Sequence, residues 1–393
     1  MDIPKFFIEV YSKAFLKPYL TRITKKMHKQ PSNFSHSSIP VTGVLITNLG
    51  TPDAATPQAL KRYLKEFLWD PRVVEIPRPV WWIILNAFVL TTRPAKSAEA
   101  YKKVWTADGS PLLSISKQQQ KALQTSLEKQ FKGPIKVALG MRYGNPSIQS
   151  ALDELREANV EKIVVLPLYP QHSAATTAST FDAIAKTFED WRYVPETRFI
   201  NQYHDDEGYI NAAANSIQKF WDNNGKAEKL VFSFHGMPKR TLGAGDPYFC
   251  QCQKTARLIT EKLNLQKDEW IVSFQSRFGK EEWLKPYASE TLEELGKQGQ
   301  KSVDVVCPGF SADCLETLEE MVDENKEVFV KAGGGQYRYI PALNDSEEHI
   351  TALTNLLLNN MQGWPGVSDW NDEEAQQVAK FRTEQAVSMG AKK

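Results

Sequence analysis

The sequence predicts an α/β protein made of two doubly wound domains, each with parallel strands covered by helices on both faces. The chain has 393 residues, of which 41% are hydrophobic and 24% are charged, a length and a balance that suit two soluble domains. Apolar runs rich in β-branched residues alternate with longer helical patterns, and this alternation is typical of parallel sheets. The runs fall into two sets of four with the same order of turns, which indicates an internal duplication.

Each set contributes four predicted strands. The first set is "GVLITNLG" (43–50), "IKVALGMRYG" (135–144), "KIVVLPLYP" (162–170) and "TRFINQY" (197–203). The second set is "KLVFSFHG" (229–236), "WIVSFQSRFG" (270–279), "VDVVCPGF" (303–310) and "YRYIPALN" (337–344). In both sets the second strand ends in an Arg-aromatic-Gly turn, the third in a proline turn and the fourth in an acidic helix start. We therefore expect domains over 41–205 and 206–344 that face each other across a cleft, with extensions at 1–40 and 363–393.

Several classes of function are excluded by what the sequence lacks. Lysine and arginine number 48 against 47 acidic residues, without a basic block interleaved with aromatics, so no nucleic-acid partner is expected. No GxSxG elbow, GxGxxG turn or P-loop occurs, which argues against serine hydrolases, dinucleotide-binding enzymes and nucleotide hydrolases. The four cysteines are too few for a disulfide framework, and Cys250 and Cys252 are interpreted as free thiols. Because no signal peptide is recognised, we expect the protein in the reducing cytoplasm.

Two segments have the composition of a membrane-surface contact. The longest apolar run, "VWWIILNAFVL" from Val80 to Leu90, is only about half of the roughly 20 residues needed to cross a bilayer, so no spanning helix is predicted. The N-terminal extension is amphipathic and basic, and fits either a helix at a membrane interface or a helix packed on the protein's own surface. Its apolar residues at helical spacing are Ile3, Phe6, Phe7, Val10 and Ala14, set among Lys5, Lys13, Lys17, Lys25 and Lys26.

Polar side chains follow several of the predicted strands. Ligands of open parallel sheets bind beyond the carboxyl ends of the strands, and His235 lies at such an end. A row of acids at α-helical spacing follows the seventh strand, and consists of Glu316, Glu320, Asp323 and Glu327. Taken singly, the histidine is more often a core residue and the acids a helix cap or a solvated face. Their combination at strand ends favours a site for a divalent ion of the iron or zinc kind.

Six motifs also occur in order along the chain. They are "LITNLGTPDAATPQALKRYLKEFL", "MRYGNPSI", "LPLYPQHSAATT", "FSFHGMPKR", "FQSRFGKEEWLKPY" and "CPGFSADCLETLEE". Together they resemble the ferrochelatase family in its proteobacterial form, from about residue 41 to about residue 362. The resemblance implies the type II chelatase fold, two Rossmann-like domains that each hold a four-stranded parallel sheet flanked by helices and that enclose a porphyrin cleft. It also implies insertion of Fe2+ into protoporphyrin IX, the last step of haem synthesis, and a C-terminal helix over 345–362 that returns to the first domain.

The resemblance implies roles for individual residues. His235 and Glu316 correspond to the metal-binding histidine and the essential glutamate, and Glu320 to a second catalytic acid. Arg142 and Tyr143 correspond to the pair that faces the macrocycle. Further substrate contacts are expected at His172, Ser173, Gln275 and Ser276, from their strand-end positions, and at Leu49 and Arg93. The segment 75–100 is expected to form an apolar lip through which the hydrophobic product leaves toward lipid.

Two alternatives remain open at this stage. A related type II chelatase would load cobalt or nickel into another tetrapyrrole, although the "HGMP" and "ETLEE" motifs argue against it. A non-catalytic haem or porphyrin carrier would keep the cleft, although the intact His235 and Glu316 argue against that. The expected partners are protoporphyrin IX and ferrous iron, with peripheral contact at the cytoplasmic face of the inner membrane, as a monomer or a homodimer. No [2Fe-2S] cluster is expected because no cysteine follows Cys314.

Overall fold

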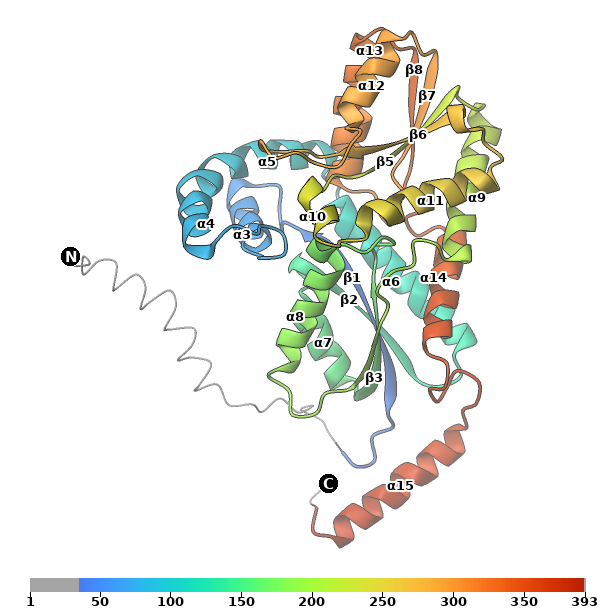
Figure 1. The fold of residues 1–393 in the computed structure, drawn as a ribbon. Coiled ribbons are helices and arrows are strands. Elements are labelled where there is room, and N and C mark those ends of the chain that lie inside the picture. The colour runs from blue at the N-terminus through green and yellow to red at the C-terminus, as the bar shows by residue number, and fades with distance from the viewer. Residues whose placement is uncertain (1–34, 392–393) are drawn as a thin grey trace, which may run out of the picture.

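A computed structural model describes residues 35–391, which form two α/β units with a helical arm beside their junction (Figure 1). Each unit contains one four-stranded, fully parallel sheet. The first sheet has the order β2-β1-β3-β4, with β1 (Val41–Thr51), β2 (Ile135–Gly144), β3 (Val160–Pro167) and β4 (Glu196–Phe199). The second has the order β6-β5-β7-β8, with β5 (Lys229–His235), β6 (Trp270–Gln275), β7 (Ser302–Val306) and β8 (Gln336–Ile340). The two orders are the same, and the predicted fold class is confirmed.

Helices flank both sheets and build the arm. Those of the first unit are α3 (Pro57–Leu68), α4 (Arg78–Ile84), the π-helix η2 (Leu85–Val89), α5 (Leu90–Val104), α6 (Pro111–Gln130), α7 (Ile148–Glu157), the π-helix η3 (Ala174–Ala178) and α8 (Ser179–Phe188). The second unit holds α9 (Glu207–Asn224), α10 (Lys239–Gly243), α11 (Tyr248–Lys262), the 3-10 helix η4 (Lys267–Glu269), α12 (Ala288–Lys297), the π-helix η5 (Glu316–Glu324) and α13 (Asn325–Lys331). The sequence supplies several N-caps, since the side chains of Thr56, Ser147 and Asp206 each accept a hydrogen bond from the backbone N–H three residues on.

Six of the eight strands end earlier than their apolar runs predict. They are β3, which ends at Pro167, β4 at Phe199, β5 at His235, β6 at Gln275, β7 at Val306 and β8 at Ile340. At β6 the reason is local, because Ser276 has a φ of 62°, in the left-handed region that a strand does not enter. The residues after these strands therefore belong to the loops where the ligand site is expected.

A continuous apolar core joins the two units. It includes Leu127 of α6, Ile217 of α9 and Leu357 of α14 (Glu347–Asn360), all of which are fully buried. α14 packs against both α6 and α9, so the helix predicted over 345–362 lies on helices of the first and second units. Because an apolar interface of this kind stabilises a fixed arrangement, the strand ends of the two sheets are held in one relative position.

The buried His349 of α14 makes the stability of this interface depend on pH. Its Nδ1–H donates to the carbonyl of Asn344 (2.7 Å), while Nε2 is buried without a partner. Burial lowers the pKa of His349 to about 4, so the unfolded chain takes up this proton first as the pH falls. The contribution of the neutral ring to stability is therefore fully present above about pH 6.5 and is lost as the pH falls toward 4.

We expect the His349→Gln variant to flatten this pH dependence. Between pH 6.5 and pH 4 the wild-type protein should lose about 3 kcal/mol of unfolding free energy that the variant, with no titrating group there, retains. Urea titrations at half-unit pH intervals measure both curves. Parallel curves for the two proteins would show that the imidazole is not the group responsible.

The last helix of the chain lies apart from this core. The tail that follows α14 forms a turn and then α15 (Asp372–Ser388), which lies against the base of the first unit (Figure 1). Residues 1–34 lie outside the described part, and so does the amphipathic pattern predicted for Ile3 to Ala14. Between residues 35 and 391, no helix combines the length and the apolar character that crossing a membrane requires.

Candidate active site

His235 is the last residue of β5. The strand buries Phe232 and Phe234 completely and leaves the imidazole half-buried at its carboxyl end. The ring Nδ1 lies 2.7 Å from the carbonyl oxygen of Gly236. Since a carbonyl can only accept, Nδ1 carries the hydrogen of the neutral ring and Nε2 keeps its lone pair for a proton or a metal ion.

The glycine after the histidine is required by the close approach of β6. A Cβ on Gly236 would lie 2.6 Å from the carbonyl oxygen of Gln275, which is too close for any larger residue. The Gly236 N–H donates to this same oxygen at 2.8 Å. The local sequence therefore fixes His235 directly beside the end of β6, where Gln275 is its partner in the ladder.

Gln275 and Ser276 hold the carboxylates of the site. The Gln275 side-chain amide donates to the backbone carbonyl of Glu316 (2.8 Å) and to Glu320 Oε2 (3.3 Å), and its own oxygen accepts from the Ser233 hydroxyl. The backbone N–H of Ser276 donates to Glu320 Oε1 at 2.6 Å, and the Ser276 hydroxyl donates to Oε2 of the same residue. Both residues were predicted as substrate contacts. Gln275 is only 2% exposed and its side chain positions the two acids, while the contact of both residues with substrate stays a prediction.

Glu320 interacts with two neighbouring titratable groups, His235 and Glu316. Burial raises the pKa of Glu320, and the neighbouring Glu316 carboxylate adds to the rise, while the Ser276 hydrogen bonds and the charge of His235 oppose it. Gln275 is the ladder partner of His235 and bonds both the Glu316 carbonyl and the Glu320 carboxylate, so the three residues lie near one another. The three predicted catalytic residues therefore meet at one strand end, and a carboxyl that keeps its proton to higher pH is suited to proton transfer.

The row of acids does not follow the predicted spacing. Residues 316–324 form the π-helix η5, whose i to i+5 hydrogen bonds widen each turn and change which residues share a face. Asp323 is exposed, and Glu327 is exposed and paired with Lys331. Glu324 is exposed as well, but burial and the charges of Glu319 and Glu320 raise its pKa, so it lies near those two acids. The α-helical spacing predicted for the row was therefore wrong, because residues 316–324 form a π-helix.

Residues of the first unit approach the same carboxylates. Leu49, near the end of β1, packs in an apolar cluster with Tyr63, Tyr101 and Leu315, the residue before Glu316. Burial raises the pKa of both tyrosines, and the Glu316 carboxylate adds to the rise in each case. Lys103 of α5 also pairs with Glu319 across the junction (Nζ to Oε1 2.9 Å). Sequence reasoning missed Tyr63 and Tyr101, because helix periodicity assigns them to an apolar face and nothing local distinguishes them.

Arg142 and Tyr143 are organised by a residue that the sequence did not reveal, Asp70. The buried Asp70 carboxylate accepts hydrogen bonds from Arg142, from the Tyr143 hydroxyl (2.8 Å) and from Ser179. Burial opposes its ionisation, but the hydrogen bond from Ser179, the backbone N–H of Arg72 and the other partners outweigh it and hold the pKa of Asp70 below its usual value. The Arg142 guanidinium covers the Tyr143 ring at 4.5 Å, and that ring is fully buried. Of the pair, Arg142 is therefore the one with a partly accessible side chain.

His172 and Ser173 join the two units. The backbone N–H of His172 donates to the Gln251 side chain at 2.7 Å, and the Ser173 hydroxyl donates to Asp246 at 3.1 Å. Asp246 lies in the loop between α10 and α11 of the second unit, and Gln251 lies in α11, so both contacts cross between the units. The contacts seen for these residues are between protein groups, and their predicted contact with substrate stays a prediction.

The predicted lip segment exposes only part of its apolar surface. Trp82 is 47% exposed and Phe88 is 64% exposed, together with Val80 and Ile83. Trp81 points inward, is buried, and donates its Nε1–H to the carbonyl of Leu68 (2.6 Å). Arg93, further along the arm, lies over the Phe278 ring of the second unit at 5.2 Å. Trp81 therefore anchors α4 to α3, and the exposed patch consists of Val80, Trp82, Ile83 and Phe88.

Within residues 35–391, no three side chains of His, Cys, Asp or Glu are arranged to enclose a metal ion. The predicted metal ligands are the two residues His235 and Glu316, beside Glu320, whose pKa is raised by burial. The site thus offers one free imidazole nitrogen and a row of carboxylates where two parallel sheets meet. Groups of these kinds bind divalent ions and move protons.

The same fold occurs in a solved metal-handling protein. The structure of SirB from Bacillus subtilis with Fe3+ matches this chain with a TM-score of 0.50 at 13% sequence identity, over 84% of this chain and 100% of SirB. This likeness concerns the fold, which is that of the type II chelatases. Fold and site together define the class of the protein as a two-unit α/β protein of the type II chelatase fold, with a histidine and carboxylates at its strand ends.

Sequence comparison gives the family. The Ferrochelatase family model matches residues 41–361. A ferrochelatase of Thioalkalivibrio sulfidiphilus is 55% identical over 362 residues, 92% of this chain and 98% of that protein. A ferrochelatase of Nitrosococcus oceani is 52% identical over 362 residues, with the same two coverages. The chain belongs to the ferrochelatase family, the lyases that insert iron into a porphyrin in haem biosynthesis.

Proposed function

We propose that this chain inserts Fe2+ into protoporphyrin IX to give protohaem, with His235 and Glu316 as the residues that handle the entering metal ion. Family membership supports the reaction. The observation that carries the assignment of residues is the meeting of His235, Glu316 and Glu320 at the end of β5. For each Fe2+ that enters the macrocycle, two pyrrole N–H protons must leave, so the site has to bind a cation and accept protons at one place.

In this proposal His235 takes the first proton. Its Nδ1–H is occupied by the Gly236 carbonyl, so Nε2 is the atom that accepts the pyrrole proton or contacts the metal. Glu320, whose pKa is raised by burial, receives the proton next and passes it along η5 toward Glu324. Gln275 and Ser276 keep the two acids in place through their hydrogen bonds.

The assay that tests the function is anaerobic incubation with protoporphyrin IX and Fe2+, or Zn2+ as a stand-in, while the visible bands of the free-base porphyrin are followed. Competition among Fe2+, Co2+ and Ni2+ separates a ferrochelatase from a cobalt or nickel chelatase acting on another ring. Tight porphyrin binding without loss of the free-base bands would instead identify a carrier, and would refute the proposal.

We also propose that the enzyme works in the cytoplasm without an iron–sulfur cluster and touches the membrane peripherally. Cluster ligands are thiolates, and burial raises the pKa of the Cys252, Cys307 and Cys314 thiols, which disfavours that form. The exposed patch on α4 and η2 supports a membrane contact, since it presents the exposed aromatic side chains of Trp82 and Phe88 on one arm.

The double substitution Trp82→Asp with Phe88→Asp is expected to weaken binding to anionic liposomes at least about tenfold, because each buried aromatic contributes about 1.5–3 kcal/mol. Liposome co-sedimentation measures this change. Val330→Asp, at a 47% exposed position on α13, is the matched control and should bind as the wild-type protein does. Equal binding by all three proteins would remove this patch as the membrane contact.

A further inference from the structure

α15 is a helix with almost no partner in the described part of the chain. Of its 17 residues only Ala379 is buried, while Val378 is 56% and Phe381 is 63% exposed. An isolated helix of about this length is marginal in water, and most helical stability in proteins comes from a packed apolar face. Its exposed apolar side chains therefore call for a further partner.

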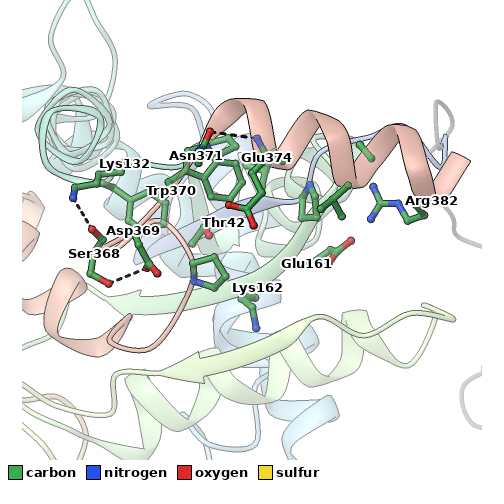
Figure 2. A pocket seen from close by; sticks show the side chains of 18 residues that line it. Thr42, Lys132, Glu161, Lys162, Ser368, Asp369, Trp370, Asn371, Glu374 and Arg382 are labelled. Atoms are coloured by element: carbon green, nitrogen blue, oxygen red, sulfur yellow. Dashed lines mark hydrogen bonds between the residues drawn. The ribbon is translucent and has the colours of Figure 1, made fainter.

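A groove runs between α15 and the base of the first unit (Figure 2). It encloses about 710 Å³ and has an apolar wall that includes Phe131, Trp370 and Val378. This groove is distant in the fold from the site at the ends of β5 and β6, because it is lined by the first residues of β1 and β3. The proposed active site makes no use of it.

Some of the charged side chains that line the groove have a hydrogen-bond or ion-pair partner, and others have none. Lys132 donates to the carbonyl of Ser368 (2.5 Å), Lys162 pairs with Glu196, and Arg382 donates to the carbonyls of residues 36 and 38. The carboxylates of Glu161 and Glu374 have no hydrogen-bond or ion-pair partner among residues 35–391. The charged groups of the groove that lack a partner are therefore carboxylates, and they lie beside an apolar wall. An occupant that combines cations with large apolar side chains fits it.

The described chain begins beside this groove. Arg382 of α15 donates from Nε to the carbonyl of His36 (2.7 Å) and from Nη2 to that of Ser38 (2.5 Å). A second, smaller cavity of about 290 Å³ lies between Ser37, Ile39 and the α15 residues around Lys380. The preceding residues, 1–34, are therefore tethered next to α15, at a high effective concentration for any contact with it.

We propose that residues 1–34 dock on α15 and its groove, with their lysines at Glu161 and Glu374 and their apolar side chains against Val378 and Phe381. The composition of the segment matches the groove. Its basic residues are Lys5, Lys13, Lys17, Arg22, Lys25, Lys26 and Lys29, against the acidic residues Asp2 and Glu9. Its apolar side chains at helical spacing, Phe6, Phe7 and Val10 among them, supply the surface that α15 lacks. The two extensions of the chain then form one structural element at the base of the first unit.

Carbodiimide cross-linking of the full chain tests the contact directly, because this reagent joins carboxylates only to amines that they touch. An equal mixture of 14N-labelled and 15N-labelled protein distinguishes links within one chain from links between copies. We expect mass spectrometry to find links within one chain from Glu161 and Glu374 to lysines of residues 1–34. Glu161→Gln should lose its own links and keep those of Glu374, which also reports that the variant is folded.

Hydrogen exchange of the full chain gives an independent readout. The amides of residues 1–34 should exchange at least tenfold faster in the double variant Val378→Glu with Phe381→Glu, and should be unchanged in the control Val330→Glu. Three results would overturn the proposal. The first is links only between differently labelled copies, which would identify a second molecule as the occupant. The second is protection that appears only with anionic liposomes, which would identify a lipid surface. The third is the absence of links together with fast exchange of residues 1–34 in the wild-type chain.

Discussion

The His235→Ala variant should lose metal insertion by about 10³-fold or more while it still binds protoporphyrin IX. The imidazole Nε2 is the free acceptor at the end of β5, and removal of a positioned proton acceptor typically lowers a rate by 10²–10⁴-fold. Loss of the metal-contacting nitrogen adds to this effect. The rate is measured from the disappearance of the free-base bands with Zn2+ under anaerobic conditions, and binding from porphyrin fluorescence quenching.

Two controls separate a chemical role of His235 from a structural one. The side chain is half-buried, and its one hydrogen bond in the structure is to the neighbouring Gly236 carbonyl, so the variant should unfold at nearly the wild-type temperature. Added imidazole should restore part of the rate, because a free base can replace the missing acceptor. A variant that keeps more than a tenth of the wild-type rate, or one that no longer folds, would contradict the assignment.

The Glu316→Gln variant should lose metal insertion by about 10²-fold or more, again with porphyrin binding retained. Gln275 bonds the backbone carbonyl of Glu316 and not its carboxylate, so this contact survives the substitution. What the variant loses is the negative charge beside His235 and Glu320. Steady-state rates across Fe2+ or Zn2+ concentrations show whether the loss appears as a higher KM for the metal ion, as expected when a metal ligand is removed.

Asp323→Asn is the matched control for this experiment, because it removes a charge from the same helix. The α-helical spacing predicts Asp323 in the row of acids, whereas the π-helix exposes it. We expect its rate to stay within about twofold of the wild-type rate, as for most exposed substitutions away from a site. If Asp323→Asn lowers the rate of metal insertion as much as Glu316→Gln does, Asp323 belongs to the row of acids that the α-helical spacing predicts. This result would contradict the role of the π-helix.

The sequence predicted what depends on local pattern. Apolar runs give strands because buried parallel strands must be apolar on both faces, and the two sets of four appear as two sheets with one strand order. His235 and Glu316 follow strands, and residues at the carboxyl ends of parallel strands meet at one edge of a sheet. Their proximity could therefore be predicted before any coordinates were known.

Local pattern failed where a contact joins distant segments. Asp70 organises Arg142 and Tyr143 from more than 70 positions away, and nothing near Asp70 in the chain indicates this. Gln275 holds two glutamates, and its local sequence does not indicate this role because its partners come from a helix about 40 residues further on. Trp81 and Trp82 are adjacent and chemically identical, yet only the packing of α4 on α3 decides which one is buried.

The sequence by itself determined the fold class, the family, and the types of side chain that handle a metal ion and its displaced protons, because composition, periodicity and motif order are properties of single segments. Only the tertiary structure decided which acids form the row, which residues orient them, and where α15 lies. The physical reason is that burial and hydrogen-bond partners are set by what packs against a residue. In the π-helix η5 even the set of residues that share a face differs from the one the α-helical period predicts.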